Sequence, residues 1–120
     1  MVPPKRLLIV EDTAAVSRLL SRSFEQAGYA ALVIDRASDL PAALDTGAFH
    51  AALVDVDLPE GADGVVVAQR LTRLRPEMLV VVMSGDHRNL ERAGAAGLTR
   101  VLPKPFTQAE LFDAVDLISG

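Results

Sequence analysis

The sequence predicts an α/β domain in which helices cover both faces of a parallel sheet. Short, continuous apolar runs alternate with longer segments whose apolar residues recur at helical spacing. Strands buried on both faces have such continuous runs, and parallel strands need helical crossovers between them. The chain has 120 residues, and half of them are apolar. That length suits one hydrophobic core, so we expect residues 1–120 to form a single domain.

The first strand and the first helix lie at the start of the chain. Leu7–Val10 is a continuous apolar run that stops at two acidic residues, as expected of a short buried strand. Ser17–Ala27 follows as a helix, with Leu19, Leu20 and Phe24 at helical spacing. The glycine after this segment is a good C-terminal stop, because glycine accepts a left-handed backbone.

The second and third strands are the apolar runs Ala30–Ile34 and Ala51–Val54. A second helix is expected between them, with Ser38 as its N-cap. Pro41 is tolerated in its first turn, where a missing amide hydrogen costs little. The helix is expected to end before Gly47.

A third helix and a fourth strand come next. Asp63–Leu74 places Val67, Leu71 and Leu74 on one helical face, and a proline two positions later prevents the helix from continuing. Leu79–Met83 is again a continuous apolar run. We expect it to be the fourth strand of the sheet.

The last part of the chain supplies two helices around a weak strand. Asp86–Ala93 is polar and is followed by two glycines, which predicts a short fourth helix. The fifth strand is the short run around Val101 and Leu102. Thr107 and Glu110 have the spacing of a capping box, which marks the start of the last helix. Its expected buried stripe consists of Leu111, Val115 and Ile118.

Composition excludes several classes of function. Sixteen acidic and twelve basic residues give a net charge of −4, and the arginines are scattered, so the chain lacks the positive stripe that nucleic acids favour. Without cysteine there is no disulfide, thiolate metal site or thiol nucleophile. No signal peptide or membrane span is recognisable. We therefore expect a cytoplasmic protein that binds neither nucleic acid nor membrane directly.

Polar side chains stand at the C-terminal ends of the predicted strands. They are Glu11, Asp12, Asp55, Ser84 and Lys104. Because the carboxyl ends of parallel strands share one edge of the sheet, these residues should converge on the crevice where ligands of such folds bind. This convergence predicts a site that no local motif defines.

The chemistry of these residues suits phosphoryl transfer. Three carboxylates brought together repel one another, and a hard cation such as Mg²⁺ is the usual remedy. Without metal, at least one carboxyl group should have a raised pKa. A carboxylate can attack a phosphoryl group, and Asp55 is the best placed to do so. Lys104 and Ser84 would supply a charge and a hydroxyl donor for the phosphoryl oxygens.

Four segments resemble the motifs of response-regulator receiver domains in two-component signalling. They read LIVED at 8–12, LVDVDLP at 53–59, VMSG at 82–85 and LPKPF at 102–106. The resemblance spans almost the whole chain. It implies the flavodoxin-like fold of the chemotaxis-regulator type, with five parallel strands in the order 2-1-3-4-5.

The resemblance also implies roles for individual residues. Glu11 and Asp12 would be the metal-binding acidic pair, Asp55 the phosphorylated residue and third Mg²⁺ ligand, and the backbone carbonyl of Asp57 a further ligand. Ser84 would bond the phosphoryl group through its hydroxyl. Lys104 would be the remaining catalytic residue and would pair its charge with the phosphoryl group. The peptide bond between Lys104 and Pro105 would be cis.

The implied function is a phosphorylation-dependent signalling switch. A histidine kinase or a histidine phosphotransfer protein would donate the phosphoryl group to Asp55, and the altered surface would engage a downstream protein. The domain would catalyse its own phosphorylation and dephosphorylation and no other reaction. The sequence leaves the target and homodimer formation open.

The chain departs from the family pattern in three places. Val101 stands where the family usually has a tyrosine or phenylalanine that acts as a switch. Residues 59–64 are one residue longer than the commonest spacing. Asp57 and Asp86 occupy two variable positions that tune the lifetime of the phosphoryl group in this family, and both are acidic here.

Two alternatives stay open on the sequence alone. Asp55-Val56-Asp57 resembles the nucleophile motif of haloacid-dehalogenase phosphatases, although those enzymes carry it on an early strand. Val101 would also permit a receiver-like interaction module that is never phosphorylated. His50 and His87 are given no catalytic role, because neither has a second histidine at metal-ligand spacing.

Overall fold

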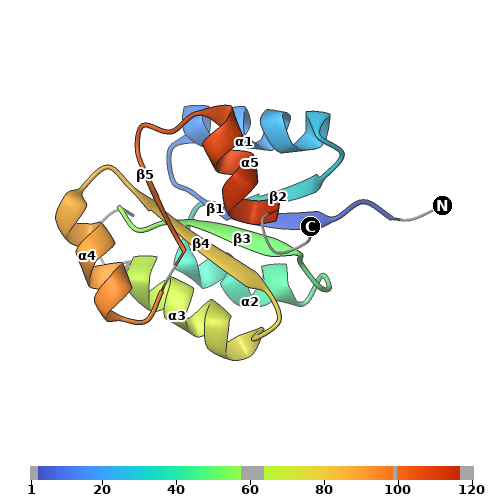
Figure 1. Ribbon diagram of the computed structural model, residues 1–120. Coiled ribbons are helices and arrows are strands. Elements are labelled where there is room, and N and C mark those ends of the chain that lie inside the picture. The colour runs from blue at the N-terminus through green and yellow to red at the C-terminus, as the bar shows by residue number, and fades with distance from the viewer. Residues whose placement is uncertain (1–2, 58–63, 99, 117–120) are drawn as a thin grey trace.

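The computed structural model describes residues 3–57, 64–98 and 100–116. Five strands form one sheet in the order β2-β1-β3-β4-β5, and every neighbouring pair is parallel (Figure 1). This confirms the predicted class, the number of strands and the strand order. The strands are β1 (Arg6–Val10), β2 (Ala30–Ile34), β3 (Ala51–Asp55), β4 (Leu79–Ser84) and β5 (Val101–Pro103).

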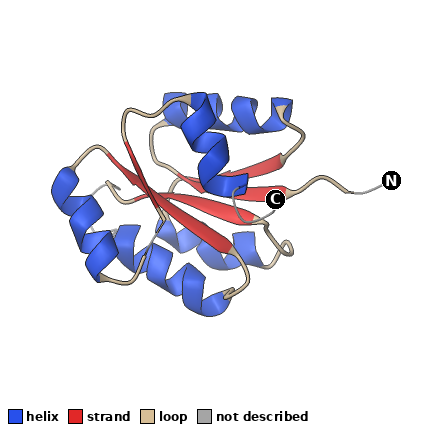
Figure 2. Cartoon of the chain, in the orientation of Figure 1, coloured by secondary structure: helices blue, strands red, loops and turns tan. Residues whose placement is uncertain are grey.

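Helices cover both faces of this sheet (Figure 2). Helices α1 and α5 lie on one face, and α2, α3 and α4 lie on the other (Figure 1). Within the described ranges, none of the helices is long and apolar enough to cross a membrane. The helices are α1 (Ala14–Gln26), α2 (Leu40–Leu44), α3 (Gly64–Leu74), α4 (His87–Ala95) and α5 (Gln108–Asp116), with a 3-10 turn at Ala37–Asp39 before α2.

The sheet separates two hydrophobic cores. Leu8 and Val54 pack on the side of α2, α3 and α4, whereas their neighbours Ile9 and Leu53 pack on the side of α1 and α5. This division follows from the alternation of side chains along a strand. Phe24 of α1 is fully buried in the second core, where its ring meets Tyr29 and Phe112 edge to face. Burying such a ring contributes roughly 2–3 kcal/mol.

The first helix begins earlier than the apolar pattern predicts. It starts at Ala14 instead of Ser17, and Thr13 occupies the N-cap position. Leu20 and Phe24 are buried, but Leu19 is 67% exposed, because adjacent helical residues point about 100° apart. Gly28 follows the helix with a φ of 95°, which confirms the predicted stop.

The start of the second helix was predicted wrongly. Ser38 is not an N-cap, because it lies inside the 3-10 turn and Asp39 occupies the cap position of α2. A serine in this turn gives the same sequence signal as a cap, so spacing alone does not separate the two. Pro41 does lie in the first turn of α2, as predicted.

The remaining helices follow the predictions with small differences. The predicted start of the third helix at Asp63 lies outside the described residues, and Leu74 is 55% exposed instead of facing the core. Asp86 caps α4 and is not part of it. The capping box of α5 is confirmed by two reciprocal hydrogen bonds: Glu110 N donates to Thr107 Oγ1 at 3.1 Å, and Thr107 N donates to Glu110 Oε1 at 2.9 Å. Leu111 and Val115 are buried, and Ile118 is outside the described residues.

Candidate functional site

The parallel register brings the predicted site residues to one edge of the sheet. Val10 pairs with Val54, so Glu11 follows β1 where Asp55 ends the neighbouring β3. Ser84 ends β4, and Lys104 follows β5. The backbone amide of Lys104 donates to the carbonyl of Ser84 at 2.8 Å, which fixes the chain after β5 against β4. The convergence predicted from the strand ends is therefore confirmed.

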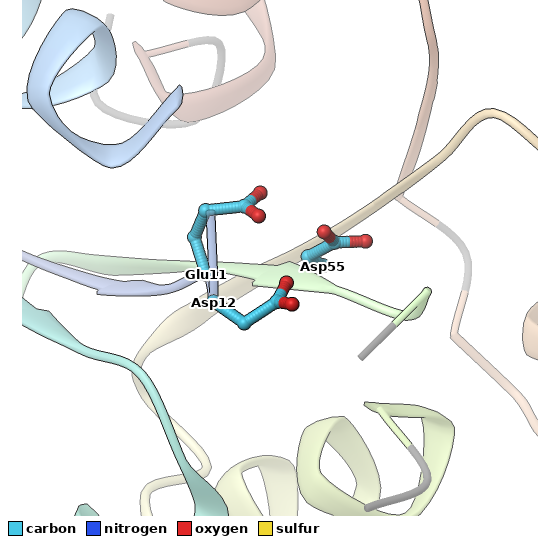
Figure 3. A group of neighbouring side chains, drawn as sticks. All are labelled: Glu11, Asp12 and Asp55. Carbon is cyan, nitrogen blue, oxygen red and sulfur yellow. The ribbon is translucent and has the colours of Figure 1, made fainter. Parts of the chain in front are cut away.

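Three carboxylates gather at the ends of β1 and β3. One oxygen from each of Glu11, Asp12 and Asp55 lies within 4.8 Å of the others, and the three groups face a shared space (Figure 3). Glu11 and Asp55 are buried, whereas Asp12 is exposed to solvent. A set of carboxylate oxygens with one solvent-accessible side suits a hard cation that retains water ligands.

The Glu11 carboxylate is the group whose ionisation this arrangement disfavours most. Its Oε1 accepts a hydrogen bond from Thr13 N at 3.1 Å, but its buried Oε2 has no hydrogen-bond partner among the described residues. Burial raises the pKa of Glu11 to about 7; the Thr13 amide and the Lys104 charge oppose this rise, and Asp55 adds to it. This confirms the expectation that one carboxyl group has a raised pKa. A buried, unpartnered oxygen of this kind fits a metal ligand.

Lys104 places its ammonium group near two of the carboxylates. Its Nζ lies 3.2 Å from Asp55 Oδ2 and 4.0 Å from Glu11 Oε2, and the lysine side chain is 29% exposed. The Lys104–Pro105 peptide bond is cis, as the resemblance implied. The ammonium therefore offsets part of the charge of two buried carboxylates.

The Asp57 side chain, which the sequence placed at a position that tunes the phosphoryl lifetime, makes contacts that the sequence did not indicate. Its Oδ1 accepts from Ser84 Oγ at 2.6 Å and from Asn89 Nδ2 at 2.7 Å, and its Oδ2 accepts from Gly85 N at 2.9 Å. Partial burial would raise the pKa of Asp57, but these hydrogen bonds and the charge of Lys104 outweigh it, and the pKa is lowered. The Asp57 carboxylate is therefore held ionised against β4 and α4.

Asn89 is a site residue that sequence reasoning missed. It lies in the first turn of α4, three residues after Asp86, and its Oδ1 accepts from Arg92 Nη1 at 3.2 Å. Its position is not at a strand end, so the rule that located the other residues could not find it. A polar residue in the first turn of the helix after β4 is the only signal in the sequence.

Asp86 has a different role from Asp57. Its side chain accepts from Arg88 N at 2.9 Å and caps α4, and the hydrogen bonds and charge of Arg88 lower its pKa. Its backbone amide donates to Ser84 Oγ at 2.8 Å. Of the two acidic positions singled out in the sequence, only Asp57 contacts the Ser84 hydroxyl through its carboxylate.

The other residues singled out in the sequence lie outside this group. His50 Nε2 is 3.1 Å from the carbonyl of Val115, and His87 Nε2 is 3.8 Å from Glu91. Val101 pairs with Val82 and is 38% exposed. Of the longer segment at 59–64, only Gly64 is described.

Gly64 sets the distance between α3 and the end of β3. A Cβ atom at this position would lie 2.4 Å from Val56 Cα and 2.6 Å from the Asp55 carbonyl oxygen. Real Cβ atoms do not approach backbone this closely, so the packing of α3 beside the site requires glycine.

Comparison with known proteins gives one consistent family. The family model described as the response regulator receiver domain matches residues 7–116. The transcriptional regulatory protein PdtaR of Mycobacterium tuberculosis is 31% identical over 118 residues, which cover 95% of this chain and 56% of that protein. The chain spans about half the length of the curated relatives it matches.

Solved structures agree with this match. A CheY-like receiver domain protein from Methanospirillum hungatei is 26% identical with a TM-score of 0.84, over 96% of this chain and 93% of that chain. The response regulator TrrA from Thermotoga maritima, solved in complex with Mg²⁺-BeF, is 19% identical with a TM-score of 0.82, over 95% of this chain and 98% of that chain. The chain therefore belongs to the response regulator receiver domain family, the signalling domains of two-component systems.

Proposed function

We propose that this chain is a phosphorylation-dependent switch in which Asp55 accepts a phosphoryl group from the histidine of a kinase or phosphotransfer protein. The observation that carries the proposal is the setting of Asp55. Its carboxylate is 3% exposed, ends the central strand β3, and has Lys104 Nζ at 3.2 Å from Oδ2. A carboxylate oxygen would attack phosphorus as the P–N bond to histidine breaks, which leaves an acyl phosphate on Asp55.

Mg²⁺ fits the acidic group beside Asp55. Glu11, Asp12 and Asp55 would supply carboxylate oxygens, and Asp57 would supply its backbone carbonyl. The buried Oε2 of Glu11, which has no hydrogen-bond partner among the described residues, supports this assignment. The ion would offset negative charge on the phosphoryl oxygens during transfer.

The other two side chains would bind the phosphoryl group. Lys104 would contribute its charge, and Ser84 would donate its hydroxyl to the phosphoryl oxygens. Residues 1–120 would form one receiver domain, and a downstream protein would read its altered surface. The curated relatives extend well beyond the matched region, so any output activity of a longer protein would come from other parts of it.

The test is the intact mass of the protein after incubation with phosphoramidate and Mg²⁺. Wild type should gain one phosphoryl mass, and Asp55→Asn or added EDTA should abolish the gain. A folded wild-type protein that gains no mass would refute the proposal and favour the interaction module that is never phosphorylated, for which Val101 is the sequence clue. The match of the receiver family to residues 7–116 argues against the phosphatase alternative.

A further inference from the structure

The Ser84 hydroxyl, which is expected to bind the phosphoryl group, already donates to another anion, and so does the neighbouring amide of Gly85. The hydroxyl of Ser84 lies 2.6 Å from Asp57 Oδ1, and the amide of Gly85 lies 2.9 Å from Asp57 Oδ2. A Cβ atom on Gly85 would lie 3.9 Å from Lys104 Cβ and 4.0 Å from Asp57 Oδ2. Gly85 thus faces the space between Asp57 and Lys104, the residue whose Nζ lies 3.2 Å from Asp55 Oδ2.

From this geometry we infer that the Asp57 carboxylate competes with a phosphoryl group on Asp55 for the Ser84 hydroxyl and the Gly85 amide. Asn89 is the positioning residue: it holds the Asp57 carboxylate where it accepts hydrogen bonds from Ser84 and Gly85. The inference rests on the proposed function, because it requires that Asp55 be phosphorylated.

The competition follows from the number of hydrogens. A serine hydroxyl and a backbone amide each have one hydrogen to donate, so neither can make a full hydrogen bond to two anions at once. The amide of Asp57 itself donates to Asp55 Oδ1 at 2.8 Å, which keeps the two acidic residues close. A phosphoryl group adds close to two negative charges beside Asp57. Phosphorylation therefore takes over both donors and expels the Asp57 carboxylate toward solvent.

Asn89 connects this exchange to α4. Its Nδ2 donates to Asp57 Oδ1 at 2.7 Å, and its Oδ1 accepts from Arg92 Nη1 at 3.2 Å. A chain of hydrogen bonds therefore runs from Ser84 through Asp57 and Asn89 to the outer face of α4. Ala93 is the only buried residue of this helix, so α4 can shift without exposing much apolar surface. This route needs no aromatic side chain at Val101.

The test compares initial rates of phosphorylation by phosphoramidate and Mg²⁺, followed by intact mass. Asp57→Ala removes the competitor and should raise the rate roughly tenfold, and Asn89→Ala removes one of its three donors and should raise the rate roughly two- to fivefold. In the Asp57→Ala background, Asn89→Ala should have no further effect. His87→Ala is the matched control, because His87 lies in the same turn of α4 and its side chain lies near Glu91, away from Asp57.

A second readout follows the amide resonances of α4 before and after phosphorylation. In wild type the shifts should extend to Asn89 and Arg92, and in Asn89→Ala they should stop at the end of β4. Additive effects of the two substitutions, or a wild-type rate in Asn89→Ala, would refute the inference while the proposed function stands. Failure of wild type itself to gain a phosphoryl group would refute both.

Discussion

Replacing Glu11 with glutamine should stabilise the metal-free protein at alkaline pH. Glutamine has nearly the same shape, its side-chain oxygen can accept the hydrogen bond from Thr13 N, and its amide can donate toward Asp55. It cannot ionise. The substitution therefore removes the buried charge of Glu11 and leaves the neutral contacts of the protonated acid in place.

The size of the effect follows from the pKa of Glu11, which rises from an ordinary value of 4.5 to about 7. A pKa raised by folding means that the folded state binds the proton more tightly than the unfolded chain. The contribution of this pKa difference to the free energy of unfolding is fully present below pH 4.5 and is lost as pH rises through about 7. The full pKa difference corresponds to roughly 3 kcal/mol in the free energy of unfolding. Partial hydration of the ionised carboxylate reduces this value to about 1–3 kcal/mol.

Urea denaturation between pH 4 and pH 8 measures this difference. In EDTA the free energy of unfolding of Glu11→Gln should match wild type near pH 4 and exceed it by about 1–3 kcal/mol at pH 8. Saturating Mg²⁺ should offset most of this difference, because an ion at 100 times its dissociation constant stabilises wild type by about 2.7 kcal/mol and the variant lacks one ligand.

Asp12→Asn is the matched control for this experiment. Asp12 is exposed, so its replacement should lose the Mg²⁺ effect without a comparable gain in EDTA. The reasoning is refuted if the free-energy difference between Glu11→Gln and wild type is the same at pH 4 and pH 8. It is also refuted if Mg²⁺ stabilises Glu11→Gln as much as wild type.

Four further substitutions test other parts of the structure. Lys104→Ala should slow phosphorylation by phosphoramidate about tenfold or more in a mass time course, because it removes the charge 3.2 Å from Asp55 Oδ2; an unchanged rate would exclude Lys104 from the transfer. Gly64→Ala should cost more than about 2 kcal/mol in urea denaturation, since its Cβ would meet backbone at 2.4 Å. Gly94→Ala in α4, where nothing lies within 4 Å, should instead gain about 0.5–1 kcal/mol, and similar values for the two would contradict the close approach at Gly64. Thr107→Ala should cost about 1 kcal/mol by removing the cap of α5, and a value near zero would mean that the cap contributes no stability.

The strands of the sheet and most of the site residues at their carboxyl ends could be predicted from the same pattern. Continuous apolar runs mark buried strands, and the residue after each run is placed at the carboxyl edge by the parallel arrangement. Asp55 and Ser84 were located in this way without any knowledge of contacts. Strand order required the resemblance, because alternation of strands and helices is compatible with several orders.

Features that depend on side-chain direction could not be predicted. The spacing of Leu19 and Leu74 is helical, but the path of each helix over the sheet leaves both exposed. The sequence indicated a backbone ligand at Asp57 and a side chain at a position that tunes the phosphoryl lifetime, but it did not indicate that this carboxylate binds Ser84, Gly85 and Asn89. Which way a loop side chain turns is decided by the donors around it, and those come from β4 and α4, far away in sequence.

The two cores on opposite faces of the sheet have an energetic consequence. Phe24 and Leu71 are both fully buried, but one belongs to the α1 and α5 side and the other to the α2, α3 and α4 side. They share no packing partners, so the losses from truncating them should add to within about 0.5 kcal/mol. Substitutions on the α1 and α5 side should therefore leave the packing under α2, α3 and α4 unchanged, and the same holds in the other direction. The two faces are joined by the strands of the sheet, whose carboxyl ends carry Asp55 and its neighbours.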